Sequence, residues 1–137
     1  MRSVIPLLIV GALTGCTYAP AQQAPMVDQR AEARLNQLLA GKVPGRPQSC
    51  LAHFRADDMV VIDDYTIAFR DGTNRVWINK PPGGCNLLSA GPYALVTHTS
   101  IGSTCRGDIA SVMDTINHAS VGSCVFSDFV PYTTPGR

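Results

Sequence analysis

The chain has 137 residues, of which 45% are hydrophobic, and its 11 Lys and Arg side chains nearly balance 10 Asp and Glu side chains. This length suits one small domain with appended segments. Eight acidic and eight basic side chains lie between Lys42 and Arg137, with neither the basic stripe of a nucleic-acid-binding protein nor the acidic tail of a chaperone-like protein, so no nucleic-acid partner is expected.

Residues 1–15 have the pattern of a secretory signal peptide. Arg2 precedes an apolar run over Val4–Leu13, which is too short to cross a bilayer and fits the hydrophobic region of such a signal. The run ends in a Leu-Thr-Gly-Cys sequence at Cys16, which closely resembles the lipobox of bacterial lipoproteins. The resemblance implies cleavage before Cys16 and acylation of its sulfur and new amino group, with palmitate among the acyl groups.

The lipobox-like sequence also implies a location. Several acyl chains on one residue anchor a protein stably, whereas a single chain binds membranes only marginally. The residue after Cys16 is Thr17, and in lipoproteins a residue other than Asp at this position usually accompanies sorting to the outer membrane. We therefore expect a lipid anchor in the outer membrane, facing the periplasm. The alternative is an ordinary secreted protein with an unmodified cysteine there.

Residues 16–27 follow as a tether, because they are small, polar and rich in proline and cannot bury a core. Residues 28–41 then show the only strong helical periodicity, with Asp28 suited to the N-cap and Gly41 to the position after the last turn. The apolar stripe of this helix consists of Ala31, Leu35, Leu38 and Leu39. A helix this short is marginal alone, so the stripe needs a surface on which to dock.

Residues 42–137 are predicted to form a mainly β, disulfide-bonded domain. Pro44, Gly45 and Pro47 make residues 42–49 a loop. Short apolar runs then alternate with turn residues, which predicts a small antiparallel sandwich or barrel of about seven strands. The expected strands are Cys50–Phe54, Met59–Asp63, Thr66–Arg70, Arg75–Asn79, Tyr93–His98, Ile109–Asp114 and Cys124–Val130, with a loop over Asn117–Ser123.

The best-defined part of this pattern is a three-stranded meander over Asp58–Lys80. Strand side chains alternate between faces, so the register is predicted by keeping apolar residues together. With turns at Asp64-Tyr65 and Gly72-Thr73, one face carries the rows Val60/Phe69/Val76 and Ile62/Ile67/Ile78, which we expect to be core. Asp63 and Asp64 are expected to shape the first turn, because Asp side chains bond backbone groups two residues on.

The opposite face of the meander is expected to carry Val61, Ala68 and Trp77, with Arg70 directly opposite Arg75. Like charges that face each other across a strand pair are mildly destabilising, and an apolar row outside the core usually has a cover. We expect the leucine stripe of the helix, or another strand, to pack there. The alternative is a surface for a ligand or partner, made by Trp77, Arg70 and Arg75.

The four cysteines after Cys16 predict two disulfides, because an even number in a small exported domain is typical of a disulfide framework. None of them forms a C-x-x-C pair, so neither zinc nor thioredoxin-like chemistry is indicated. Four cysteines allow three connectivities. We favour Cys50–Cys124, which ties the first strand to the last, together with Cys85–Cys105.

No motif predicts catalysis, a metal site or a cofactor. The three histidines, His53, His98 and His118, lack the paired spacing of metal ligands. Asp57 and Asp58 form an acidic pair, but nothing around them indicates acid–base chemistry. Arg106-Gly107-Asp108 spells the integrin-binding tripeptide, which here is expected to form the turn that opens the next strand.

Five stretches spread over residues 38–132 carry a wider resemblance: LLAGKVPGRPQSCL, VIDDYTIAF, RVWINK-PPGGC, TCRGDIASVMD and GSCVFSDFVPY. They resemble a family of small exported alphaproteobacterial proteins with four cysteines, classed as a domain of unknown function. The family pattern would have Tyr where this chain has Trp77. The resemblance implies one exported, disulfide-bonded domain and brings no catalytic residues with it.

These features favour a non-enzymatic, membrane-tethered periplasmic lipoprotein that acts as a binding or accessory module for an envelope protein or glycan. A second hypothesis is an inhibitor of an envelope-targeting hydrolase such as lysozyme, by architectural analogy with small disulfide-bonded lipoproteins. A third is an enzyme acting on cell-wall glycans. It would need a deep pocket lined by Asp57, Asp58 or His98.

Overall fold

The computed structural model describes residues 28–52, 58–97 and 102–136. This part of the chain is mainly β, with one helix and ten strands in three antiparallel sheets, so the predicted fold class is confirmed. The elements are α1 (Gln29–Leu39), β1 (Val43–Pro44), β2 (Cys50–Ala52), β3 (Met59–Asp63), β4 (Thr66–Asp71), β5 (Arg75–Asn79), β6 (Tyr93–Thr97), β7 (Ser103–Cys105), β8 (Ile109–Asp114), β9 (Ser120–Val125) and β10 (Phe129–Thr133). Within the described ranges no helix combines the length and apolar character needed to span a bilayer. The predicted signal peptide, Cys16 and the tether lie outside them.

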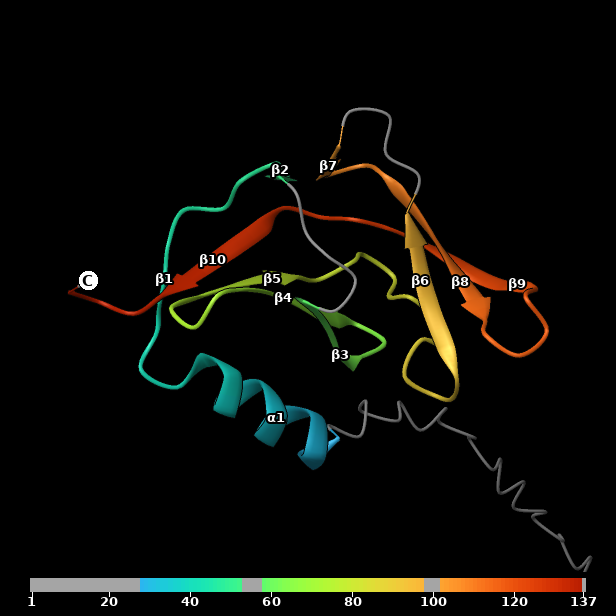
Figure 1. Ribbon diagram of the computed structural model, residues 1–137, viewed down its shortest axis with the longest axis horizontal. Coiled ribbons are helices and arrows are strands. Elements are labelled where there is room, and N and C mark those ends of the chain that lie inside the picture. Colours follow the sequence, from blue (N-terminus) through green and yellow to red (C-terminus); the bar gives the residue numbers. More distant parts are fainter. Residues whose placement is uncertain (1–27, 53–57, 98–101, 137) are drawn as a thin grey trace, which may run out of the picture.

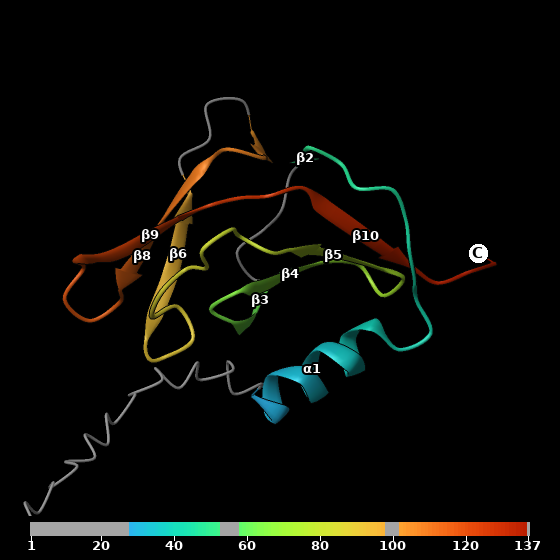
Figure 2. The ribbon, with the colours of Figure 1, turned by 180° about the vertical axis from the view of Figure 1, so that it is seen from behind.

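Three layers stack on one another. The five-stranded sheet, in the order β1-β10-β5-β4-β3, lies in the middle. Helix α1 covers one face, and the β6-β8-β9 and β2-β7 sheets lie on the other side (Figure 1; Figure 2 from behind). The larger core, between the sheets, contains the rings of Phe69, Phe126 and Phe129, whose centroids are 5.7 to 6.3 Å apart. β4, near the middle of the central sheet, is therefore buried on both faces from Thr66 to Phe69.

Helix α1 follows its sequence signals closely. The Asp28 carboxylate accepts a hydrogen bond from the Arg30 N–H at 3.0 Å, which makes Asp28 the predicted N-cap. Gly41 has a φ of +70°, the left-handed conformation expected after a helix end. The predicted stripe of Ala31, Leu35, Leu38 and Leu39 packs on the central sheet. The central sheet thus provides the docking surface that such a short helix needs for stability.

The predicted register of the meander is wrong by one residue along most of both strand pairs. Val60 lies opposite Ala68, not Phe69, and Phe69 lies opposite Trp77, not Val76. A slip of one residue moves every side chain to the other face. The prediction assumed that only one face is core, but β4 is buried on both faces from Thr66 to Phe69, so hydrophobic alternation could not choose between registers. The first turn itself is as predicted, because Asp63 lies opposite Thr66, and a bulge between Val61 and Asp63 shifts the rest of the β3–β4 pair by one residue.

This register changes the position of Trp77. The indole is only 7% exposed and belongs to the core between the sheets, on the face away from α1. Arg75 lies opposite Asp71, pairs with its carboxylate at 3.4 Å and has its guanidinium 5.8 Å from the indole centroid. Arg70 lies opposite Val76, on the face that α1 covers. Trp77 and Arg70 thus lie on opposite faces and do not form the alternative binding surface with Arg75, and the leucine stripe does not cover Trp77.

The two disulfides are present, but their predicted pairing is wrong. They join Cys50 to Cys105 and Cys85 to Cys124. Cys50 lies directly opposite Cys105 in the β2-β7 sheet. The prediction tied the first strand to the last through Cys124, but the last strand is β10, which contains no cysteine. With sequence separations of 55 and 39 residues, loop entropy assigns each bridge about 4 kcal/mol of stability.

The C-terminal strand prediction joined two strands that belong to different sheets. The predicted strand Cys124–Val130 covers the end of β9 and the start of β10. Between them the chain leaves the β6-β8-β9 sheet and enters the central sheet, while Phe126 and Phe129 stay buried in the core. Most of the predicted loop Asn117–Ser123 is β9 itself. The run Cys124–Val130 is apolar because the chain passes through the core between β9 and β10, and not because it forms one strand.

Candidate functional site

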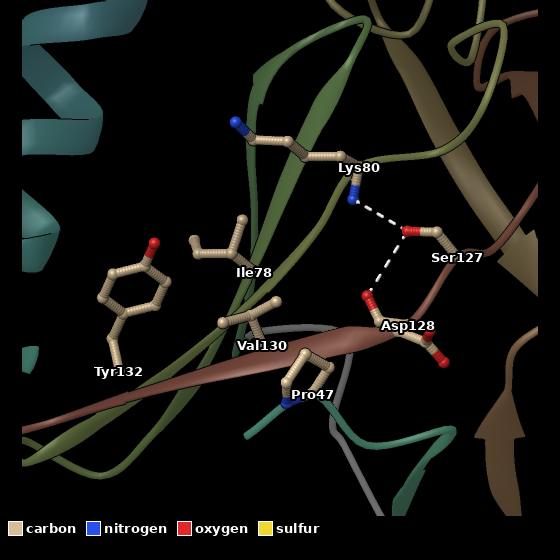
Figure 3. A pocket seen from close by; sticks show the side chains of 7 residues that line it. All are labelled: Pro47, Ile78, Lys80, Ser127, Asp128, Val130 and Tyr132. Atoms are coloured by element: carbon tan, nitrogen blue, oxygen red, sulfur yellow. Dashed lines mark hydrogen bonds between the residues drawn. The ribbon is translucent and has the colours of Figure 1, made fainter. Parts of the chain in front are cut away.

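Helix α1 leaves part of the central sheet uncovered, and a surface groove lies there. We name it the β5–β10 groove (Figure 3). Its volume is about 380 Å³. The residues that line it are Pro47, Ile78, Lys80, Ser127, Asp128, Val130 and Tyr132. They come from three segments that are distant in sequence.

The floor of the groove is apolar. Val130 lies directly opposite Ile78 in the β10–β5 pair, and both side chains belong to the face that carries α1. Ile78 is 4% exposed, whereas Val130 and Tyr132 are half-buried. Pro47 closes one side, and the Tyr132 ring lies on the side nearer α1 (Figure 3). A hydrocarbon or ring of a ligand would find an apolar surface here.

The rim is held by the buried amide of Asn79. This side chain is 0% exposed, and its Nδ2 donates to the Ser127 carbonyl at 2.8 Å while its Oδ1 accepts from the Ser127 N–H at 3.2 Å. The Lys80 N–H in turn donates to Ser127 Oγ at 3.3 Å (Figure 3). A buried polar group whose bonds are all made holds its surroundings in one arrangement. The groove is therefore preformed.

The two charges on the rim are not equivalent. The Asp128 carboxylate accepts a hydrogen bond from the Arg106 guanidinium at 3.2 Å, in an exposed ion pair. Lys80 has no ion pair with any residue in the described part of the chain. Its exposed ammonium stands above the apolar floor (Figure 3). The groove thus suits a ligand with an apolar group and a carboxylate.

A second cavity, of about 420 Å³, lies where the start of α1 meets β3 and the segment before β6. Its lining includes Arg30, Ser89 and Tyr93, and Arg34, which donates to the Val61 carbonyl at 2.9 Å. This cavity is more polar than the β5–β10 groove.

Asp63 and the Arg-Gly-Asp tripeptide, which the sequence singled out, form turns in the structure. The Asp63 carboxylate accepts from the Tyr65 N–H at 2.7 Å, as predicted for a turn. Asp64 instead reaches out to the segment that follows Cys85. The Asp108 carboxylate accepts from the Cys105 N–H at 2.7 Å, so the Arg-Gly-Asp tripeptide forms the expected turn before β8.

Of the candidate bases and ligands of the sequence, Asp58 and His118 lie in the described part of the chain. His118 is exposed in the turn before β9, with a φ of +54°. His53, Asp57 and His98 lie outside the described residues. Across the ranges that the structure describes, no group of three His, Cys, Asp or Glu side chains is placed to hold a metal.

The β5–β10 groove was not predicted from the sequence. Lys80 was only the residue before the Pro81-Pro82 break, and Ser127 and Asp128 lay inside a predicted strand. The signal that was available is the polar Ser-Asp pair between Phe126 and Phe129, because two polar residues inside an apolar run mark a strand end.

No family model, curated protein or solved structure matches this chain. The resemblance to small exported alphaproteobacterial proteins therefore stays a prediction.

Proposed function

We propose that this protein is a periplasmic lipoprotein, tethered to the outer membrane through Cys16, which binds an envelope ligand without catalysing a reaction. The observation that carries the binding role is the β5–β10 groove, with its apolar floor and the Lys80 ammonium at its rim. Two disulfides support an oxidising compartment outside the cytoplasm. The lipobox-like sequence ending at Cys16 supports the anchor.

The groove favours a ligand with two parts. An apolar or ring-shaped group packs on Ile78, Val130 and Tyr132, and a carboxylate meets the ammonium of Lys80. Because Asn79 and Ser127 already hold the rim, little order has to be created on binding. Envelope peptides and glycan–peptide fragments combine such groups, so we take peptidoglycan fragments as the first class to test.

The anchor is tested by metabolic labelling with radioactive palmitate. The expected result is label on the natural chain and none on Cys16→Ser. Globomycin, which blocks the lipoprotein signal peptidase, should lead to accumulation of the uncleaved precursor. Processing that ignores globomycin, together with an unlabelled natural chain, would refute the anchor and leave the groove untouched.

The groove is tested by titrating soluble peptidoglycan fragments into the full chain by calorimetry. Lys80→Glu should weaken binding roughly tenfold, since it replaces attraction by repulsion at the rim. Arg30→Glu is the matched control, with the same change of charge in the second cavity and at a helix start that tolerates acids. Equal affinities for both variants, or no binding by the natural chain, would refute the assignment to this groove.

A further inference from the structure

β9 is an edge strand whose protection is limited to one bulge at Val121, the residue that the pairing with β8 skips between Ser120 and Gly122. It ends the sheet order β6-β8-β9 and, within the described residues, pairs only with β8. Its sequence, Ser-Val-Gly-Ser-Cys-Val, contains no charged residue and no proline. An edge strand of this kind presents unpaired backbone groups that can accept another strand, and natural sheets usually block such edges.

The edges of the central sheet carry more protective devices than the single bulge of β9. β1 is only two residues long and contains Pro44, which donates no hydrogen bond. β3 carries a bulge after Val61, whose carbonyl accepts from the Arg34 side chain at 2.9 Å. Short strands, proline, bulges and charged side chains are the common protective devices. The central sheet uses them at both edges.

The outward side chains of β9 are Val121, Ser123 and Val125, all exposed, whereas Cys124 points into the core. Val125 lies directly opposite Ile109 of β8, which is 62% exposed. No charge stands on this face of β9. An exposed apolar surface rimmed by a bare strand edge is typical of an interaction site.

We propose that this edge binds a second copy of the same chain, with the two β9 strands pairing antiparallel about a two-fold axis at Ser123. Directly opposite residues in an antiparallel pair share a face. A two-fold axis at Ser123 places Val121 opposite Val125 of the other copy, and Ser123 opposite its own counterpart. The outward sequence Val-x-Ser-x-Val reads the same in both directions, so this register pairs Val125, in the regular part of β9, with Val121 at the bulge.

The palindrome is what favours a second copy over a foreign peptide. Pairs of β-branched residues across strands are favourable, and like charges across strands are unfavourable. Two copies gain two Val–Val pairs and bring no like charges together on β9. A peptide-binding edge needs pockets for alternate side chains, whereas the outward side chains here are small and neither cavity described above includes β9. One strand pair buries less than the ~1,200–2,000 Å² of a standard interface, so the dimer is expected to be weak.

Cysteine cross-linking tests the register. The full chain is prepared as Cys16→Ser, so that the introduced cysteine has no competing free thiol. Ser123→Cys should give covalent dimer as the major species on mild oxidation, because opposite residues lie ~4.5–5.5 Å apart, within disulfide reach. Val121→Cys should give little, since the two copies of residue 121 would be four positions, or about 13 Å, apart. Peptide mapping checks that the two native disulfides are retained.

Sedimentation of the same chain without added cysteines gives an independent readout. Its average mass should rise towards twice the monomer mass with concentration, and Ser123→Lys should abolish that rise. Val43→Lys, at an exposed position of β1, is the matched control and should leave the rise unchanged. Equal cross-linking at residues 121 and 123, or a natural chain that stays monomeric, would overturn the proposal. So would an edge occupied by another partner or by the chain's own N-terminal segment, since neither gives the residue-123 cross-link.

Discussion

The carboxylate of Asp64 accepts hydrogen bonds from the backbone N–H and the hydroxyl of Ser89, at 2.7 and 2.8 Å. Its other oxygen accepts from the Leu87 N–H at 3.2 Å, and its carbonyl accepts from the Cys85 N–H at 2.6 Å. The first hairpin turn thus anchors the segment that carries the buried Cys85–Cys124 bridge. This role differs from that of Asp63, which bonds only within the turn.

We expect Asp64→Ala to lower the free energy of unfolding by about 2 kcal/mol, because it removes three hydrogen bonds to a charged acceptor. Asp63→Ala, which loses one local hydrogen bond, should lose about 1 kcal/mol or less. Urea unfolding with the disulfides intact measures both. Equal losses would show that Asp64 acts only as a turn former.

Gly84 and Gly83 offer a matched pair of substitutions. Both have positive φ, at +75° and +81°, so alanine at either position should lose about 1–2 kcal/mol from backbone strain. A Cβ at Gly84 would also lie 2.8 Å from Cε1 of Tyr65, whereas one at Gly83 would meet nothing within 4 Å. Thermal unfolding should therefore show a clearly larger loss for Gly84→Ala. The reverse order would contradict the contact between this loop and Tyr65.

Asn79→Ala should destabilise the protein by about 2–3 kcal/mol, because it leaves the N–H and carbonyl of Ser127 without their buried partner. Asn74→Ala, at an exposed hairpin position, should change stability by no more than about 0.5 kcal/mol. Denaturant titration measures both. If the rim of the β5–β10 groove depends on Asn79, the alanine variant should also bind groove ligands more weakly than the natural chain, under conditions where both are fully folded.

The pairing of the cysteines is checked by peptide mapping without reduction, which should recover Cys50 linked to Cys105 and Cys85 linked to Cys124. Removing the exposed bridge by Cys50→Ala with Cys105→Ala should lower stability by about 4 kcal/mol from loop entropy. Removing the Cys85–Cys124 bridge instead should lower stability by more than this, because Cys85 is fully buried and its sulfur fills space in the core. Urea unfolding of the two double variants gives the order.

The turn after β8 should respond to acid. Hydrogen bonds from the backbone N–H groups of Ile116 and Asn117 lower the pKa of Asp114 below its ordinary value of 3.8. Since the folded pKa lies below the unfolded pKa, the stabilisation is complete above 3.8 and is lost as the pH falls through the folded value. In an NMR titration, the two N–H signals should move together with a midpoint below 3.8. A midpoint at or above that value would contradict the turn geometry.

Local features of the fold could be predicted from the sequence because their causes are local. The Asp28 cap and the Gly41 conformation depend on a few neighbouring residues. The bounds of β3, β5 and β8 follow from apolar runs between turn residues, and they agree with the prediction. The Asp63 turn likewise needs only a side chain and the N–H of Tyr65.

Features that depend on several segments could not be predicted. The predicted register of the meander was wrong for two reasons. A bulge in β3 shifts its pairing with β4, and β4 is apolar on both faces, so its pattern does not separate a core face from an outer face. The disulfide pairing depended on β2 meeting β7, two three-residue strands that are distant in sequence. The β5–β10 groove gathers Pro47, Lys80 and Asp128 from three segments. No short-range signal connects them.

The two disulfides interleave along the chain, because Cys85 lies between Cys50 and Cys105, and Cys105 lies between Cys85 and Cys124. Any single cut between Cys50 and Cys124 therefore leaves two fragments that at least one bridge still joins. After a protease cuts the chain there, the two fragments stay covalently joined until the disulfides are reduced. If Cys16 carries the proposed lipid anchor, one backbone cut in this region would leave both pieces attached to the membrane.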